Sequence, residues 1–440
     1  MRWERLISDK RLGLEEFHDP RRHTRSDFQR DYDRLIFSSP FRRLQNKTQV
    51  FPLPGSFFVH NRLTHSLEVS SVGRSMANEV AIILASRHEN EEWVGKIHNI
   101  GDIVATACLC HDLGNPPFGH NGEKTISTFF TEGEGMDLRR HLTDQQWDDL
   151  THFEGNANSF RLLTHQFEGR REGGYAMTYS SLAAVVKYPH GSQLAGEKGK
   201  FGFFGSEEDI YRRVAVDLGI PELEPGRFAR HPLVWLVEAA DDICYQVMDI
   251  EDAHRLKILS TGEVKQLFLG FFDEERRQRM TRTMDRLKDP NEQIGYLRSN
   301  VIGAMVEDCA RVFAENEDAI LEGSLKGALT AMMADRLSEA YQRCSDTAWA
   351  KIYRSAEVVD IEIAGNRILT YLLSHLTQAA LHPERNFSRL LFEKVPAQYS
   401  TQAPDLFSRI QGVLDHVSGM TDMYALNLYR QLNGLTLPAV

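Results

Sequence analysis

Hydrophobic residues recur at helical spacing along most of the chain, whereas the strict alternation typical of β-strands is scarce. Four apolar stripes have this spacing, and the third follows Pro232, a residue that helices accept in their first turn. The stripes are Val69, Val72, Met76, Val80 and Ile83; Ile100, Ile103, Ala107 and Cys110; Leu233, Val237, Ala240, Cys244 and Met248; and Ile361, Ile368, Leu369 and Leu372. The pattern predicts an all-α fold.

Breaks in the pattern indicate where helices end. Gly114 and the pair Pro116-Pro117 end the second stripe, because proline cannot continue a helix and restricts the residue before it. Residues 189–231 are rich in glycine and proline, with interspersed phenylalanines. We expect a long irregular insertion there, which lies either near a functional site or in an ordinary surface loop. Beyond about residue 260 the chain again has a charged, helical pattern.

Composition narrows the class of protein. The 440 residues are 42% hydrophobic and 26% charged, as in globular proteins, and the net charge of −11 argues against a general nucleic-acid coat. A basic stretch nevertheless offers a local surface for phosphate; it contains Arg21, Arg22, Arg25, Arg30, Arg34, Arg42, Arg43 and Lys47. Five sparse cysteines, no signal-peptide pattern and no long uncharged apolar run favour a cytoplasmic protein without a membrane span.

Ionisable residues interrupt the buried edges of three predicted helices. His65 lies four residues before Val69, the pair His111-Asp112 follows the second stripe, and Asp241 lies four residues after Val237. Each residue alone is commonly a hydrogen-bonded core group. Together they would carry a large desolvation cost unless they share a compensating charge, and a divalent cation supplies one. Asp242 is the neighbouring alternative to Asp241, which shares a helix face with Tyr245 and Asp249.

The order His … His-Asp … Asp resembles that of the HD-domain metal-dependent phosphohydrolases. The surrounding sequence resembles the deoxynucleoside triphosphate triphosphohydrolases, the dGTPase branch of that family. The similar blocks are RDYDRLIFSSPFRRLQNKTQVF (30–51), HNRLTHSLEVS (60–70), HDLGNPPFGHNGE (111–123), HFEGNANSFRLL (152–163), SLAAVVKYP (181–189) and LVEAADDICYQVMDIEDA (236–253). They cover the first 250 residues or so, and the C-terminal third is similar mainly through RSAEVVDIEIAGNRI (354–368).

The resemblance implies a fold and a metal site. We expect an HD-domain helical bundle over 1–260 and an additional C-terminal helical lobe over 261–440 that serves oligomerisation and completes the pocket. The implied metal ligands are His65, His111, Asp112 and Asp241. Mn²⁺ or Mg²⁺ is the expected ion, and the same ligands suit Zn, Co, Ni or Fe.

Catalytic and substrate-binding residues follow from the same resemblance. His120 and Glu123 lie three residues apart on one helix face, and they match the family's catalytic dyad. Whether His120 acts as base, acid or nucleophile stays open. Asn115 stands where some relatives carry histidine, and an amide cannot carry the charge that a proton relay requires. Arg42, Arg43 and Lys47 are weaker phosphate candidates. The implied substrate-binding residues are Gln49, Arg62, Asn115, His152, Lys187, Tyr245 and Asp249.

The implied reaction converts a deoxynucleoside triphosphate and water into a deoxynucleoside and inorganic triphosphate. Tyr245 would pack against C2′ of the sugar and exclude a ribose hydroxyl. The alternatives are an HD-domain phosphohydrolase of another phosphoester (a monophosphatase or a cyclic phosphodiesterase) and a catalytically silent nucleotide- or nucleic-acid-binding regulator. The resemblance further implies a homo-oligomer, with a hexamer expected, and an effector that is a second dNTP or single-stranded nucleic acid.

Overall fold

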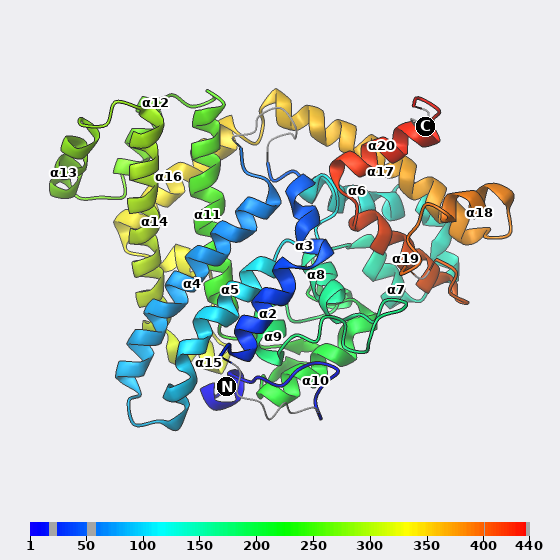
Figure 1. Cartoon of the computed structure of the whole chain (residues 1–440), viewed down its shortest axis with the longest axis horizontal. Helices are drawn as coiled ribbons and strands as arrows, with labels where there is room; N and C mark the ends of the chain where they lie inside the picture. Colours follow the sequence, from blue (N-terminus) through cyan, green and yellow to red (C-terminus); the bar gives the residue numbers. More distant parts are fainter. Residues whose placement is uncertain (17–23, 51–58, 400, 437–440) are drawn as a thin grey trace.

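The computed structural model describes residues 1–16, 24–50, 59–399 and 401–436, and helices make up almost all of its regular structure (Figure 1). The all-α prediction is confirmed. The only sheet among the described residues is a short antiparallel hairpin of β1 (Glu222–Glu224) and β2 (Arg227–Phe228). Arg21 and Arg22 of the expected basic surface lie outside the described residues.

Three helices form the centre of the molecule and carry the first three predicted stripes. α4 (Arg62–Arg87), α5 (Ile100–Cys110) and α11 (Val234–Arg255) pack against one another. Except for the half-buried Ile83, all members of these stripes are buried. Pro232 lies just before α11 rather than in its first turn, because Leu233 is the residue at the N-cap position. α2 (Asp27–Ile36) and α9 (Tyr179–Val185) cover α5.

Local sequence determines where the central helices start and stop. Asn61 caps α4 through a reciprocal pair of hydrogen bonds with Thr64, which fixes the turn that presents His65. α5 ends at Cys110 with His111 as its C-cap, as the following glycine and prolines predict. The chain then turns through Phe118, whose φ of 64° lies in the left-handed region, and enters α6 (Gly119–Thr131).

Shorter helices surround this centre. The α-helices among them are α1 (Trp3–Leu6), α3 (Ser39–Arg43), α7 (Asp144–Thr151), α8 (Gly155–Thr164) and α10 (Glu208–Leu218). The 3₁₀ helices are η1 (Leu44–Asn46), η2 (Glu92–Asn99), η3 (Glu134–His141), η4 (Ser192–Leu194), η5 (Gly205–Glu207) and η6 (Leu329–Met332). The expectation that 189–231 is irregular is therefore wrong beyond about residue 205. The apolar side chains of Tyr211, Val214 and Leu218 give α10 a buried face that the glycines and prolines around it obscure.

The C-terminal helices form two groups on opposite sides of the centre (Figure 1). The first group comprises α12 (Thr261–Leu269), α13 (Glu274–Met284), α14 (Pro290–Glu315), α15 (Glu317–Glu322) and α16 (Asp335–Lys351), and α14 packs on both α4 and α11. The second comprises α17 (Ala356–Leu381), α18 (Asn386–Phe392), α19 (Leu406–Ser418) and α20 (Asp422–Leu432). α17, about 39 Å long at 1.5 Å per residue, packs against α6.

Three arginines of the expected basic stretch have partners within the chain. Arg25 and Arg30 are paired with Asp33 and Asp27. Arg34 is half-buried and donates to the backbone carbonyls of Tyr175 and Ala176. These contacts occupy the cations of Arg25, Arg30 and Arg34, whereas Arg42 at the end of α3 is exposed.

Two further features concern the chain as a whole. Each of the five cysteines is buried and unpaired with another cysteine. Among the helices described, none combines the length and the apolar character that a bilayer crossing needs.

Candidate active site

Three of the four predicted metal ligands converge where α4, α5 and α11 meet. The Nε2 atom of His65 lies 3.1 Å from Oδ1 of Asp241, and Nε2 of His111 lies 3.5 Å from the same oxygen. One donor atom from each residue fits within a group no wider than 4.8 Å. The chain thus brings together two imidazoles and a carboxylate from helices that are far apart in sequence.

Asp112 lies beside this cluster and faces a cation of the chain itself. Its Oδ2 atom is 2.7 Å from Nη1 of Arg62 and 3.6 Å from Nε2 of His111. Arg62, expected to bind substrate, is therefore held at the cluster by the carboxylate expected to bind metal. The guanidinium also lies close to the backbone at Gly119, where a Cβ would sit 2.4 Å from Nη2. With its φ of 59°, this position requires glycine.

The cluster suits a divalent cation on two grounds. Nε2 of His111 is buried and has no hydrogen-bond partner among the described residues, so a lone pair there is available to a metal. Burial lowers the pKa of His111, but the negative charges of Asp112 and Asp241 have the larger effect and raise that pKa to about 9. A site that attracts a proton this strongly attracts a cation as well, and its nitrogen and oxygen donors suit Mn, Fe, Co, Ni or Zn.

The predicted dyad is formed at the start of α6. Nδ1 of His120 lies 3.0 Å from Oε2 of Glu123, and Oε1 of that carboxylate accepts a 3.0 Å hydrogen bond from the backbone N–H of Gly155. The hydrogen bond to Glu123 raises the pKa of His120. Glu123 is buried while the His120 side chain is 69% exposed, so the carboxylate is fixed and the imidazole faces outward. The pair can hold a proton and pass it to a bound group.

A cavity of about 270 Å³ joins the cluster and the dyad. Most predicted site residues line it: Gln49, Arg62, His65, His111, Asp112, Asn115, His120, Lys187, Asp241 and Tyr245. The side-chain oxygen of Gln49 is buried without a partner among the described residues, so it is available to a donor of a ligand. The lining also includes Asn156 of α8, Glu238 of α11, and Tyr188 and Lys200 from loops, which sequence reasoning missed.

Lys200 connects the dyad to a second buried carboxylate. Its Nζ atom lies 2.5 Å from Oε2 of Glu154 and 3.7 Å from Oε2 of Glu123. Burial and the neighbouring Glu123 raise the pKa of Glu154. Lys200 belongs to the glycine-rich segment and carries no periodic signal, so the sequence pattern did not point to it.

The predicted sugar-binding face of α11 has an additional partner. The Tyr353 hydroxyl donates a 2.6 Å hydrogen bond to Oδ2 of Asp249, and its ring stacks on that of Tyr245 with centroids 5.8 Å apart. Burial raises the pKa of Asp249 to about 7. Tyr353 lies between α16 and α17, where the sequence pattern indicates no element. It ties the C-terminal part of the chain to the cavity.

The lining of the cavity does not include His152, Lys47 or Asp249. His152 is the C-cap of α7, and its Nδ1 contacts the backbone carbonyl of Asp148. Lys47 is buried, and its ammonium donates to the backbone carbonyls of Asn115 and Ser418. Burial lowers the pKa of Lys47 to about 7. Lys47 therefore stabilises the turn before α6 instead of meeting phosphate.

Comparison with known proteins adds a family to this geometry. Residues 62–188 match the HD domain model, and residues 331–431 match that of the phosphohydrolase-associated domain. The chain is 37% identical to a deoxyguanosinetriphosphate triphosphohydrolase-like protein of Pseudomonas aeruginosa, across all of both chains. It is 36% identical to one of Synechocystis, over 99% of this chain and all of that one. A deoxyguanosinetriphosphate triphosphohydrolase of Yersinia enterocolitica is 29% identical, over 92% and 93%.

The chain belongs to the deoxyguanosinetriphosphate triphosphohydrolase-like family of HD-domain proteins. Membership supports a phosphohydrolase activity, and HD-domain phosphohydrolases depend on a metal. The HD match contains His65, His111, Asp112 and the His120–Glu123 dyad. The expected domain boundary near residue 260 stays a prediction, because the two matched segments leave 189–330 unassigned.

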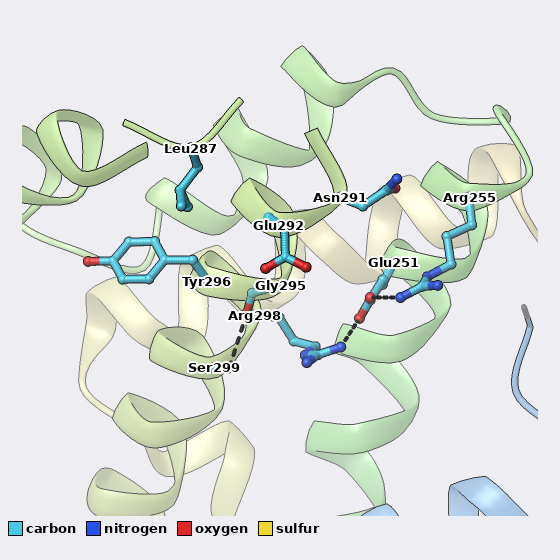
Figure 2. Close-up of a pocket in the computed structure, with 9 residues that line it drawn as sticks. All are labelled: Glu251, Arg255, Leu287, Asn291, Glu292, Gly295, Tyr296, Arg298 and Ser299. Atoms are coloured by element: carbon cyan, nitrogen blue, oxygen red, sulfur yellow. Dashed lines mark hydrogen bonds and ion pairs between the residues drawn. The ribbon is translucent and has the colours of Figure 1, made fainter. Parts of the chain in front are cut away.

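A larger cavity elsewhere has a different chemistry. About 750 Å³ in volume, it lies between the end of α11 and α14 (Figure 2). Its two arginines, Arg255 and Arg298, both point to Glu251, each at 2.7 Å from a carboxylate oxygen. Since Glu251 pairs with both arginines, Glu292 adds a second carboxylate to the lining, and none of the predicted metal ligands lies there, we place the active site at the smaller cavity.

Proposed function

We propose that this protein hydrolyses deoxynucleoside triphosphates to deoxynucleoside and inorganic triphosphate, with a divalent cation as cofactor. One observation carries the proposal: a single cavity holds the His65–His111–Asp241 cluster, the His120 ring and Tyr245 of the sugar face. The names of the related proteins agree with such a substrate.

The chain's own residues account for the phosphoryl end of the reaction. A cation bound by His65, His111 and Asp241, with Asp112 beside them, would supply Lewis-acid stabilisation of charge on a phosphoryl oxygen. Arg62 lines the cavity with its guanidinium fixed by Asp112, which leaves further N–H donors for phosphate oxygens. Lys187 and Lys200 offset the remaining charge of a triphosphate.

Proton transfer is assigned to the dyad. Glu123 engages Nδ1 of His120, so Nε2 is the atom that faces a ligand. In the balanced reaction, the oxygen of water joins the α-phosphorus, the bond from that phosphorus to O5′ breaks, and O5′ receives a proton. His120 is positioned to move a proton to or from these oxygens as acid or base; as a nucleophile it would instead bond to the α-phosphorus, and water would then break that bond.

Selection of deoxyribose is assigned to α11. Asp249 would accept a hydrogen bond from the 3′-hydroxyl, Gln49 would contact the sugar and base edge, and Tyr245 would pack against C2′. Tyr353 holds the Tyr245 ring and the Asp249 carboxylate from behind. A 2′-hydroxyl would clash with the tyrosine ring, which disfavours ribonucleotides.

The decisive test is product analysis with metal-depleted protein. Each dNTP is offered with Mn²⁺ or Mg²⁺ added back, alone and in mixtures that include any activating nucleotide, and the phosphate product is resolved. Inorganic triphosphate supports the proposal, whereas orthophosphate from other esters would support a different HD-domain phosphohydrolase. Binding of nucleotides without turnover would support a silent regulator.

Adjacent carboxylates provide a matched control for the metal site. Asp241→Asn should abolish activity and bound metal together. Asp242→Asn should retain metal, because the Asp242 carboxylate contacts Thr330 at 3.1 Å and does not belong to the cluster. Loss of metal from the second variant only would transfer the ligand role to Asp242.

Assembly and regulation remain separate proposals. A homo-oligomer, with a hexamer expected, would be tested by sedimentation at several protein concentrations. A second dNTP or single-stranded nucleic acid as effector would be tested by its effect on turnover of a fixed dNTP.

A further inference from the structure

A second cavity adjoins the active site, and its lining contains more cations than carboxylates. It measures about 860 Å³ and shares Lys187, Tyr188, Lys200 and Glu238 with the active-site cavity. We call it the cationic groove. The charged side chains that line it are Lys187, Lys198, Lys200, Arg227, Arg230, Lys326, Glu197 and Glu238. Four of the six cations have carboxylate partners, namely Lys187, Lys200, Arg227 and Arg230, so the capacity to attract an anion lies with the two that remain.

Glu238 organises the junction between the two cavities. Its carboxylate oxygens lie 3.0 Å from Nζ of Lys187 and 3.0 Å from Nη1 of Arg230. The Arg230 guanidinium also lies over the ring of Trp235, 4.8 Å from its centroid. These contacts fix a lysine and an arginine along the passage from the metal cluster into the groove, so the passage is cationic before any ligand arrives.

Lys198 and Lys326 line the groove but not the active-site cavity, and they have no such partners among the described residues. Both are exposed, and no carboxylate of the described residues lies within ion-pair distance of either ammonium. They come from segments far apart in sequence, one after η4 and the other between α15 and η6. Two unpaired cations from unrelated loops on one groove are available to an external anion.

The volume of the active-site cavity and the side on which the groove adjoins it indicate the kind of anion. The active-site cavity of about 270 Å³ falls just below the roughly 300–1,000 Å³ of typical ligand sites. A nucleotide that places its α-phosphate at the cluster therefore needs further room. Tyr245 and Gln49 line the active-site cavity but not the groove, whereas Lys187 and Lys200 line both. The phosphate chain, not the base, points toward the groove.

We propose that the cationic groove binds phosphates beyond the third one of a 5′-polyphosphate, so that deoxynucleoside 5′-tetraphosphates are also substrates. The inference rests on the proposed function. Lys198 and Lys326 contact the distal phosphates, while Lys187 and Lys200 contact the nearer ones. The chemistry stays the same: water adds to the α-phosphorus, the bond to O5′ breaks, and the products are deoxynucleoside and inorganic tetraphosphate.

Binding is tested first, without metal or turnover. Isothermal titration calorimetry measures the affinity of the full chain for inorganic triphosphate and for linear inorganic tetraphosphate. A chelator is present throughout, so that binding of metal by the polyphosphates does not contribute to the signal. Each exposed lysine contact is expected to contribute roughly twofold to fivefold in affinity. Tetraphosphate should therefore bind the wild type roughly 4-fold to 25-fold more tightly than triphosphate.

Charge-removing variants locate the effect. The double variant Lys198→Gln/Lys326→Gln should lose most of the preference for tetraphosphate and keep its affinity for triphosphate. Lys394→Gln, an exposed lysine after α18 and away from the groove, should behave like the wild type. The inference would be overturned if the wild type bound triphosphate and tetraphosphate equally well, or if the double variant kept the preference for tetraphosphate. So would displacement of tetraphosphate by a single-stranded oligonucleotide with a free 5′-hydroxyl, since the groove would then be a nucleic-acid site.

Turnover separates failure of this inference from failure of the proposed function. Deoxyguanosine 5′-tetraphosphate should give inorganic tetraphosphate, with kcat/KM reduced by the double variant while kcat/KM for dGTP stays unchanged. Turnover of dGTP without turnover of the tetraphosphate would reject the groove only. If no dNTP is hydrolysed, the proposed function fails, and the calorimetric preference still decides whether the groove binds polyphosphate.

Discussion

Tyr353 donates its phenolic proton to Asp249 across a gap of 2.6 Å, and this contact joins the C-terminal part of the chain to the predicted sugar pocket. Burial raises the pKa of Asp249 to about 7, while the hydrogen bond from Tyr353 acts in the opposite direction. The tyrosine therefore keeps more of the carboxylate ionised near neutral pH. An ionised Asp249 is the better acceptor for a 3′-hydroxyl.

Removal of this hydroxyl should weaken substrate binding more than it slows turnover. In Tyr353→Phe the pKa of Asp249 should rise further, so KM for a dNTP should increase roughly threefold to tenfold at pH 7 and recover partly at higher pH. The measurement is KM and kcat between pH 6.5 and 8.5. Tyr371→Phe is the control, because its ring stacks on His375 in α17, away from the cavity. A change in kcat alone would contradict a sugar-binding role.

Gly365 permits the close contact between α17 and the turn that leads to His120. A Cβ at this position would lie 2.7 Å from Cγ of Phe118, the residue with left-handed backbone just before α6. Gly365→Ala should displace this turn, lower kcat at least tenfold and reduce the free energy of unfolding by about 1–3 kcal/mol. Steady-state kinetics and denaturant titration measure the two effects.

Another helical glycine gives the matched control for this substitution. Gly303 lies inside α14, and a Cβ there meets no atom within 4 Å. Gly303→Ala should leave kcat unchanged and increase the free energy of unfolding by about 1 kcal/mol, since alanine is the better helix former. Equal behaviour of the two variants would show that the Phe118 contact does not position His120.

The part of this site that the sequence allowed us to predict is the set of residues on the buried faces of helices. His65, His111 and Asp241 continue the apolar stripes of α4, α5 and α11, so helix packing alone brings them together. Tyr353 and Lys200 were missed because they lie outside any periodic segment and reach the cavity only through tertiary packing.

Charge alone was a poor guide to the role of individual cations. Arg62 and Lys47 both lie in segments that resemble the family. Arg62 lines the cavity, whereas Lys47 is buried and donates to the backbone carbonyls of Asn115 and Ser418. A sequence pattern gives the type of side chain and its face on a helix. It does not give the partners that loops from distant parts of the chain provide.

His60 stabilises the start of α4 through two carboxylates. Its Nδ1 lies 2.8 Å from Asp252 and its Nε2 lies 3.0 Å from Glu68. Burial opposes the charged ring, but these carboxylates outweigh it and raise the pKa of His60 to about 10. The charged ring thus stabilises the folded state fully below the unfolded pKa of about 6.5, and this contribution is lost as the pH rises toward 10.

His60→Gln should therefore destabilise the protein in a pH-dependent way. We expect a loss of about 1–3 kcal/mol in the free energy of unfolding at pH 6 and a much smaller loss near pH 10. Denaturant titration across this range measures both. His98→Gln, at an exposed histidine without an ion pair among the described residues, should show no such trend. A loss that grows with pH would reject the charged His60.

The pH dependence of turnover should report the His120–Glu123 pair. The hydrogen bond from His120 to Glu123 is the largest cause of the raised pKa of His120. Glu123→Gln removes the negative charge, so the pKa of His120 should fall and the corresponding limb of the kcat/KM profile should move to lower pH. A rising limb identifies His120 as a base, and a falling limb identifies it as an acid. His152→Gln, away from the cavity, should leave the profile in place. If Glu123→Gln lowers kcat without moving either limb, the carboxylate orients the ring and does not set its protonation.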